Sequence, residues 1–488
     1  MLAPWAQEEM EAVDLVDKRL DKRVALILSA LGDRPTASIP AACGGFAETT
    51  AAYRFFDNEK AIPQAILQPH YDRTKQRIAE NRVVLMVQDT TEMDLTRPKA
   101  QVVGAGPMDA SSRRGMFLHL MEAFTDDGTP LGAVWSDMWT RPDEEVPLSQ
   151  EDKQKQRKVT PIEEKESYRW LEGLRQARAV AEESPTTTCV CVADSESDIY
   201  EVIAEPRGTE HPIQWLIRAS ADRSLLPTTE AQEQAAHLRA AVMATPVLYT
   251  QQITVRGRTP KTGCETRGRR QPRTDRNAEV EVRATTVTLK PPRRPDRRLL
   301  PVTANVVLVH ELNPPQGDQP VEWILVTTLP IGTAEDVRTI IQYYTVRWMI
   351  ELLFRILKSG CRVEARRFEH IDRLLPCLAI YVIAAWRTLM VCRMGRSCPG
   401  IDCEAIFEPA EWKAVYMVVK RRNPPKQPPR LVEMIRMIGQ LGGWVNRPNR
   451  KDLPGVQTIW LGLQRMHDLA SAWVAFGPGA TKKLVQNN

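Results

Sequence analysis

Two short stretches rich in apolar and β-branched residues constrain the fold of this 488-residue chain more than any other feature. They are Val83–Val87 and Thr186–Ala193. A strand whose residues are apolar without alternation is typically buried on both faces of its sheet, so helices or loops must cover both faces. Helical patterns lie around both stretches, and the sequence therefore predicts an α/β fold.

The composition excludes several classes of protein. Hydrophobic residues make up 43% of the chain and charged residues 26%, which argues against global disorder. The longest apolar run, Leu374–Trp386, is shorter than the roughly 20 residues that span a bilayer. The acidic N-terminus has no apolar segment typical of a signal peptide. We therefore expect a soluble cytoplasmic protein with no membrane partner.

The nine cysteines do not form a recognisable metal or disulfide pattern. They are scattered and include no CxxC pair, and Cys398 and Cys403 have no nearby histidine at zinc-site spacing. We expect neither a zinc site nor a disulfide framework.

The pattern of apolar residues changes along the chain, and we divide it accordingly. Residues 1–72 indicate short helices, including one over Glu8–Leu31. An α/β pattern covers 73–204, a β-rich stretch covers 205–328, the α/β pattern resumes over 329–392, and helices fill 393–488. The β-rich stretch contains five predicted strands: Gln214–Ser220, Val247–Val255, Ala278–Leu289, Val302–His310 and Glu322–Thr328.

Outside the β-rich stretch the sequence predicts several longer elements. Met116–Phe124 and Leu131–Trp139 indicate two strands joined by a turn. Helices are predicted over Ile162–Glu182, Ala334–Lys358 and Leu374–Cys392. In the last helix an apolar seam indicates core packing more than an intermolecular contact; its residues are Ile459, Leu463, Met466, Ala470 and Trp473.

Positive charge is concentrated in one segment of a chain whose net charge is only +5. Between Arg256 and Arg298 there are 14 Lys and Arg against 5 Asp and Glu. Such an excess indicates a polyanionic partner, although a solvated basic loop fits the charge equally well.

Each of the two apolar stretches is followed closely by an aspartate, Asp89 and Asp194. Ligands in open α/β sheets bind beyond the carboxyl ends of the strands, where carboxylates from neighbouring strands can hold a divalent cation. The observation is weak by itself, because an aspartate often simply opens a turn.

The predicted helix Ala334–Lys358 carries a polar stripe on an otherwise apolar surface. At about 100° per residue, Tyr344, Arg347, Glu351 and Lys358 project within an arc of about 60°. An Arg347–Glu351 ion pair would explain only two of the four. Unpaired charges are costly against an apolar core, so we expect the stripe to face a polar cavity.

The spacing Tyr344-x2-Arg347-x3-Glu351-x6-Lys358 resembles the helix signature of the bacterial DDE transposases of the IS-four group, and the chain as a whole resembles their Tn-five type. Further matches lie in order across nearly the full length. They are AYRFFDN at 52–58, QDTT at 88–91, RGMFLHL at 114–120, MWTRPDE at 138–144, EKESYRWL at 164–171, ADSESDIY at 193–200, the segment 311–330, and IWLGLQRM near the C-terminus.

The resemblance implies an RNase H-like catalytic core with a β-rich insertion, flanked by an N-terminal helical DNA-binding domain and a C-terminal helical dimerisation domain. It implies a catalytic, metal-binding triad at Asp89, Asp194 and Glu351, holding two Mg²⁺ (or Mn²⁺) ions. The implied activity is cut-and-paste transposition of an insertion sequence through a DNA hairpin intermediate.

Further residues are implied as DNA contacts. Tyr344, Arg347 and Lys358 would bind phosphates near the transposon end, and Trp323 would stack on a flipped base. Arg218 matches another contact position, and Arg54 is the best candidate in the N-terminal region. A core role for Trp323 and a surface role for Arg54 remain as alternatives. The group often has Arg after the second Asp, where this chain has Ser195.

The implied partners are double-stranded DNA, as transposon ends and as target, and a second copy of the chain in the synaptic complex. The implied location is the bacterial cytoplasm, in association with the nucleoid. Two other functions stay open at this point. One is an RNase H-like nuclease without strand transfer, and the other is a DNA-binding protein without activity.

Overall fold

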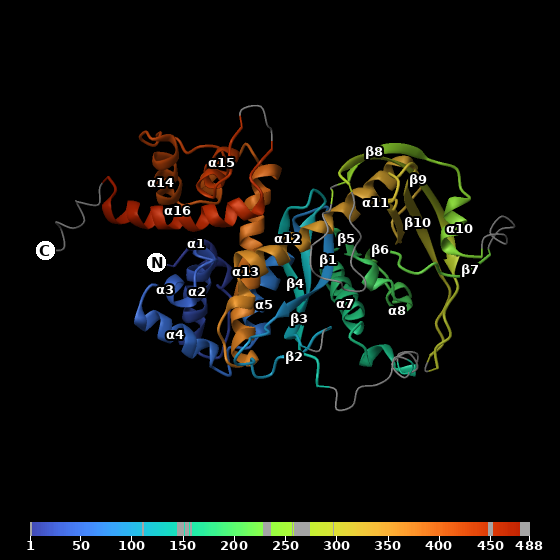
Figure 1. Ribbon diagram of the computed structural model, residues 1–488, viewed down its shortest axis with the longest axis horizontal. Helices are drawn as coiled ribbons and strands as arrows, with labels where there is room; N and C mark the ends of the chain where they lie inside the picture. Colours follow the sequence, from blue (N-terminus) through green and yellow to red (C-terminus); the bar gives the residue numbers. More distant parts are fainter. Residues whose placement is uncertain are drawn as a thin grey trace. The chain divides into compact units, whose positions relative to one another are not determined.

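Figure 1 shows a computed structural model of the chain. The structure describes residues 2–109, 112–143, 159–227, 236–255, 274–295, 297–447 and 452–478, with the single positions 151, 156 and 257. The chain divides into two compact units. The first is Met1–Val146 with Trp348–Asn488, and the second is Pro147–Arg347. Part of the basic segment, at positions 256, 258–273 and 296, lies outside the described residues.

Short helices begin the first unit. They are α1 (Pro4–Glu9), α2 (Lys18–Asp33), α3 (Ile39–Cys43), α4 (Phe46–Phe56) and α5 (Pro63–Ala79). The single helix expected over Glu8–Leu31 is wrong, because the chain breaks between α1 and α2. Asp14 and Asp17 accept hydrogen bonds from the backbone N–H groups of Val16 and Arg19, and such side chains compete with helix formation.

The sheet of the first unit is antiparallel. Strand β3 (Arg114–Thr125) lies between β1 (Val83–Asp94) and β4 (Pro130–Trp139), and β2 (Gly106–Pro107) pairs with the start of β3. The predicted strand pair at 116–139 is confirmed. The expectation that the first strand ends before Asp89 is wrong, because pairing with β3 continues to Asp94. Asp89 therefore lies inside a strand.

The longest helix, α13 (Ile371–Ser397), packs against α2, α5 and β4 and confirms the predicted apolar helix. It is the one helix among the described residues whose length and apolar composition would suit a membrane span. However, 83% of its most apolar 18-residue stretch is buried in the structure. The core helix of a soluble protein can have the same length and apolar composition.

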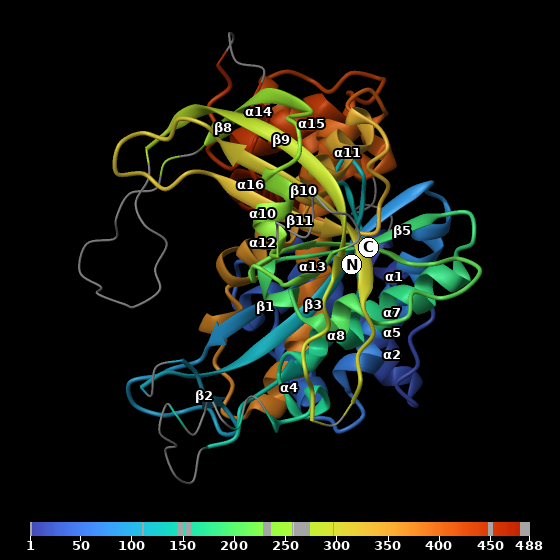
Figure 2. The same ribbon diagram turned by 90° about the vertical axis from the view of Figure 1, so that its right-hand side faces the viewer.

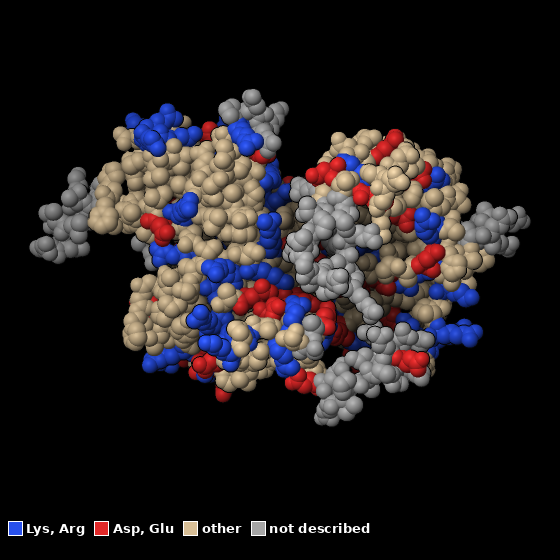
Figure 3. All heavy atoms as spheres, in the orientation of Figure 1, with Lys and Arg blue, Asp and Glu red and all other residues tan. Residues whose placement is uncertain are grey.

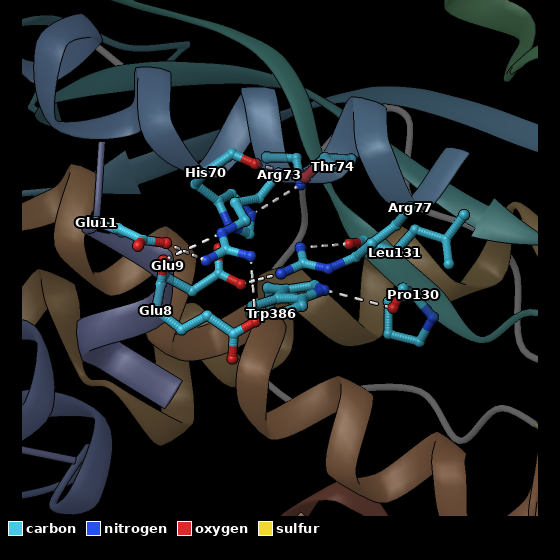
Figure 4. Close-up of polar contacts among 11 residues, drawn as sticks. Glu8, Glu9, Glu11, His70, Arg73, Thr74, Arg77, Pro130, Leu131 and Trp386 are labelled. Atoms are coloured by element: carbon cyan, nitrogen blue, oxygen red, sulfur yellow. Dashed lines mark hydrogen bonds and ion pairs between the residues drawn. The ribbon is translucent and has the colours of Figure 1, made fainter. Parts of the chain in front are cut away.

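A buried polar cluster joins α1, α5 and α13 (Figure 4). His70 Nδ1 lies 2.6 Å from Glu9 Oε2, and Arg77 also contacts Glu9. The ring of Trp386 packs against both His70 and Arg77, with centroid distances of 4.8 Å and 4.6 Å. The ion pairs satisfy charges that would otherwise be costly to bury, so the cluster ties the first helix to the core.

Three helices close the first unit: α14 (Pro409–Lys420), α15 (Leu431–Leu441) and α16 (Val456–Phe476). Gly462 lets α16 approach α15 closely, since a Cβ there would lie 2.0 Å from the carbonyl oxygen of Ile438. The predicted seam is buried within the chain at Ile459, Leu463, Met466 and Ala470, while Trp473 is half-buried. This outcome agrees with core packing of the seam.

The second unit contains a larger sheet in the order β5-β6-β11-β10-β9-β7, with β8 also paired to β9. Strands β5 and β6 are parallel, and the other pairs are antiparallel. The strands are β5 (Thr188–Ala193), β6 (Gln214–Arg218), β7 (Leu225–Leu226), β8 (Tyr249–Val255), β9 (Arg276–Leu289), β10 (Val302–Glu311) and β11 (Glu322–Thr327). All five strands predicted in the β-rich stretch are confirmed. Figure 2 shows β8, β9 and β10 as neighbours.

Helices accompany this sheet. They are α7 (Tyr168–Glu183), the short α8 (Tyr200–Ile203), α10 (Leu238–Met243) and α11 (Ala334–Val346). Helix α7 begins later than the predicted helix at Ile162, where a 3-10 turn, η1 (Ile162–Glu164), stands instead. A capping box fixes the start of α11, because the side chains of Thr333 and Asp336 each accept a backbone N–H of the other.

The single helix expected over Ala334–Lys358 is also wrong. Helix α11 ends at Val346, α12 covers Trp348–Arg355, and a π-helix, η3, follows over Ile356–Gly360. The constant 100° per residue that aligned the polar stripe does not hold across these changes. Tyr344 and Arg347 belong to the second unit, and Glu351 and Lys358 belong to the first.

Candidate active site

Asp194 stands at the carboxyl end of β5, as the sequence predicts. It caps the 3-10 turn η2 (Ser195–Ser197), and its carboxylate accepts a hydrogen bond from the backbone N–H of Ser195. The neighbouring parallel strand β6 ends at Arg218, because Ala193 is in register with Ile217. The strand register alone therefore brings Arg218 beside Asp194.

Two arginines contact the Asp194 carboxylate. Arg218 Nη2 donates to Oδ1 at 2.7 Å, and Arg347 Nη1 lies 3.6 Å from Oδ2. Burial raises the pKa of Asp194, but hydrogen bonds from Ser195 and the charges of Arg347 and Arg218 outweigh it and lower the pKa to about 2. The carboxylate is therefore ionised at neutral pH. One acid between two bases leaves a net positive charge, which favours phosphate binding.

Two aromatic residues complete this cluster. Trp323, on β11, meets Tyr344, on α11, edge to face with ring centroids 5.5 Å apart. The Arg347 guanidinium lies 5.9 Å from the Tyr344 ring centroid. Tyr344 is buried, and burial raises the pKa of its hydroxyl, which stays a hydrogen-bond donor at neutral pH. Trp323 is half-buried rather than part of the core.

Asp89 lies in the first unit, half-buried on β1, where its carboxylate accepts the N–H of Thr90 at 2.8 Å. A fully buried histidine contacts the residues that precede and follow Asp89 in the strand. His119, on β3, lies 2.7 Å from Thr90 Oγ1 and 3.1 Å from Gln88 Oε1 through its two ring nitrogens. The sequence reasoning missed His119, although it stands inside the matched segment RGMFLHL.

Glu351 and Lys358 also lie in the first unit. Glu351 is half-buried on α12, a helix that packs against β1. Lys358 stands in the π-helix η3. Burial lowers the pKa of Lys358, against the opposing charges of Glu364 and Glu92. Lys358 therefore has acidic groups near it. The alignment of the polar stripe in the sequence did not predict these neighbours.

Arg54 is exposed on α4, in the N-terminal region. It lines an open groove of about 570 Å³ between α2 and α4, together with Arg19, Arg23 and the exposed Phe46. Basic side chains beside an exposed aromatic are suited to contact with nucleic acid.

The predicted triad is divided between the units, with Asp89 and Glu351 in the first and Asp194 in the second. Within the parts of the chain that the structure describes, no group of three or more His, Cys, Asp or Glu side chains is arranged to hold a metal ion. The donor set nevertheless fits Mg²⁺ or Mn²⁺, because all three ligands are carboxylates, which hard cations prefer. Asp194 is in the ionised form that binding requires.

Three family models match the chain in order. The model described as Transposase DNA-binding matches residues 2–61, Transposase DDE domain matches 147–384, and Transposase Tn5 dimerisation domain matches 382–474. These matches define a DDE transposase, an enzyme of metal-dependent DNA cleavage and strand transfer. The chain belongs to the Tn5-type transposases of the IS4 family, the group that its sequence motifs resemble.

The predicted fold class is confirmed: an α/β protein whose RNase H-like DDE domain is flanked by a DNA-binding domain and a dimerisation domain. The match to the DDE domain includes Asp194 and Glu351, while Asp89 precedes it. Among solved structures, the chain is similar to a piggyBac transposase synaptic complex with hairpin DNA. That similarity has 8% identity, covers 100% of this chain and 80% of that chain, and has a TM-score of 0.35.

Proposed function

We propose that this transposase moves an insertion sequence by cut-and-paste, binding its terminal inverted repeats and passing through a DNA hairpin. The observation that carries the proposal is the cluster around Asp194. Five residues singled out from four segments of the sequence lie together within one unit: Asp194, Arg218, Trp323, Tyr344 and Arg347.

In this proposal Asp89, Asp194 and Glu351 form the catalytic triad and hold two Mg²⁺ or Mn²⁺ ions. Bound there, the ions would lower the pKa of a nucleophilic hydroxyl or water and stabilise the leaving oxygen. Arg218 and Arg347 keep Asp194 ionised and fixed in place. Arg218, which is half-buried, is the arginine of the pair that we expect to contact the phosphates beside the scissile bond, while Arg347 and Tyr344 are buried beside it.

Trp323 is the residue that we assign to the hairpin step. A hairpin requires the strand to turn sharply, and moving one base out of the helix relieves the crowding at the turn. The indole is half-buried and fixed by its edge contact with Tyr344, so it can accept a base on its face. Trp323 contacts Tyr344, and Tyr344 lies beside Arg347, which contacts Asp194. This position supports base stacking by Trp323 over the alternative of a core role.

The other partners follow from the flanking regions. We infer that the groove containing Arg54 contacts the inverted repeat and that the helices from residue 393 onward pair two protomers in the synaptic complex. We keep the boundaries 1–72, 73–204, 205–328, 329–392 and 393–488 as the proposed domains, with Lys358 as a further phosphate contact. Action on the bacterial nucleoid follows from the DNA substrate.

An in vitro transposition assay tests the proposal. A donor plasmid carrying the element's two ends is incubated with purified protein, Mg²⁺ and a target plasmid, and joined products are sequenced. The proposal predicts donor excision and insertions bounded by the complete ends. Cleavage without joined products would instead indicate a nuclease, and binding without cleavage an inactive DNA-binding protein.

A further inference from the structure

A basic segment on the surface of the first unit is not used by the site described above. It joins α14 to α15 over residues 420–430 and carries Lys420, Arg421, Arg422, Lys426 and Arg430 without any Asp or Glu. All five side chains are exposed. Lys and Arg gather over α14 in Figure 3. We call this segment the basic arch.

The basic arch is held at both ends. Arg421 N–H donates to the Met417 carbonyl at 2.9 Å, which closes α14. At the other end, Cys403 N–H donates to the Pro429 carbonyl at 3.1 Å and Leu431 N–H to the Ile401 carbonyl at 2.8 Å. Four prolines stand between, at 424, 425, 428 and 429. Prolines restrict the backbone, so little conformational entropy would be lost when the arch binds a ligand.

Among the described residues the side chains of the arch make no ion pair, although the backbone N–H of Arg430 donates to Glu433 Oε2 at 3.2 Å. Across the described residues, none of the five lies within ion-pair distance of an Asp or Glu side chain; Arg422 instead lies 5.5 Å from the Tyr416 ring centroid. A solubilising surface mixes charges of both signs, whereas residues 420–430 carry positive charge alone, with Asp402 and Glu433 beside the Arg430 end. Its repulsion is relieved by a polyanion.

Arg421 adds an independent observation. It caps α14 in the left-handed region, at φ 53° and ψ 39°. Glycine is the usual residue in this position, because a side chain there is strained. A strained backbone at a residue with a long cationic side chain suggests a use for that side chain. Stabilising the helix end does not require it, since Lys420 already supplies a cation there.

We propose that the basic arch binds target DNA through its phosphates. Duplex DNA is a dense and regular polyanion that matches an extended row of cations. Reading bases in the major groove needs an inserted helix or a β-ribbon, and the arch is neither. Contact limited to phosphates does not depend on DNA sequence. Such contact suits a target DNA whose sequence varies. The inference rests on the proposed insertion into target DNA.

The test compares two triple variants of the full-length protein. Lys420→Gln/Arg422→Gln/Lys426→Gln removes three charges, and Lys420→Arg/Arg422→Lys/Lys426→Arg keeps them. Binding to a random-sequence duplex is measured by fluorescence anisotropy between about 50 and 200 mM salt. Loss of three phosphate contacts should weaken binding at least about tenfold and reduce the slope of log affinity against log salt by about 2–3. The charge-keeping variant should bind as the wild type does.

Arg421→Gly separates a DNA contact from a structural role, because the two effects have opposite signs. Relief of strain should raise the melting temperature, while loss of the cation should weaken binding to the random duplex. Unchanged duplex binding in both charge-removing variants would overturn the proposal. Equal losses of affinity for the random duplex and for the element's own end would also overturn the proposal. The arch would then contact the element's end as well.

Two assays, one with intact ends and one with pre-cut ends, distinguish this failure from failure of the proposed function. The charge-removing triple variant should cut intact ends at the wild-type rate and join pre-cut ends to target more slowly. If it both cuts and joins normally, the arch has no role with target DNA and the proposed function stands. If the wild type itself joins no ends, the proposed function is at fault.

Discussion

In the proposed mechanism, replacing Trp323 by alanine should perturb the hairpin step selectively. Stacking of a base on an aromatic side chain contributes about 1–3 kcal/mol, so its loss should slow hairpin formation and opening by roughly ten- to a hundredfold. The first nick should keep its rate, because it does not need a flipped base.

The stability cost should be small. Trp323 is half-buried, and its edge contact with Tyr344 is worth about 0.5–1.5 kcal/mol. A tryptophan lost from a core costs about 3–5 kcal/mol. Trp215, buried on the same sheet, provides the comparison, and Trp215→Ala should lower the melting temperature and slow every step together.

The assay is a time course of nicked, hairpin and double-cut products beside a thermal melt. A substrate that lacks the flipped base should partly rescue Trp323→Ala, because no base then needs to be unstacked. Two results would refute the reasoning: a folded Trp323→Ala protein with normal hairpin kinetics, or one that behaves as Trp215→Ala does.

Three further predictions follow from particular residues. Cleavage should be abolished by each of the changes Asp89→Asn, Asp194→Asn and Glu351→Gln, since amides keep the shape but lose the charge that binds metal. In a mobility-shift assay, the affinity of each variant for the element's end should stay within about threefold of the wild type. A variant that cleaves at the wild-type rate would exclude its residue from the triad. Val474 and Phe476 are exposed near the end of α16, so Val474→Asp/Phe476→Asp should prevent paired-end complexes on a sizing column without lowering the melting temperature; persistent pairing would move the interface elsewhere. Glu122 is fully buried with no hydrogen-bond partner among the described residues, and burial raises its pKa well above 4.5. Its contribution to stability is therefore intact below about pH 4.5 and falls by up to about 1.4 kcal/mol per pH unit until the folded pKa is reached. Urea melts of Glu122→Gln should show a flatter dependence on pH, and an unchanged slope would mean that Glu122 is ionised in the folded protein.

The strands could be predicted from the sequence more fully than the geometry of the active site could. Strand β5 ends where apolar residues give way to Asp194, so its end could be read directly. Asp89 could not be placed in the same way, because β1 continues past it through pairing with β3, a partner more than twenty residues away along the chain. Pairing between distant segments leaves no local signal.

The helix that carries the polar stripe shows a second limit. Constant helical periodicity aligned Tyr344, Arg347, Glu351 and Lys358, but the interruption at Arg347 and the π-helix at Lys358 change the angles. The pairing of Arg218 with Asp194 depends on the parallel register of β5 and β6, and the role of His119 depends on β3 lying beside β1. Only a structure supplies these neighbours.

We propose that the carboxylate site around Asp194 cuts DNA through a hairpin. The most direct measurement follows one strand-labelled element end, with Mg²⁺ present, on native and denaturing gels. We predict that a nick appears first, a covalently closed hairpin next and an open double-strand break last, with none of these products in Asp194→Asn. A double-strand break that forms without a hairpin, or cleavage that persists in Asp194→Asn, would contradict the account.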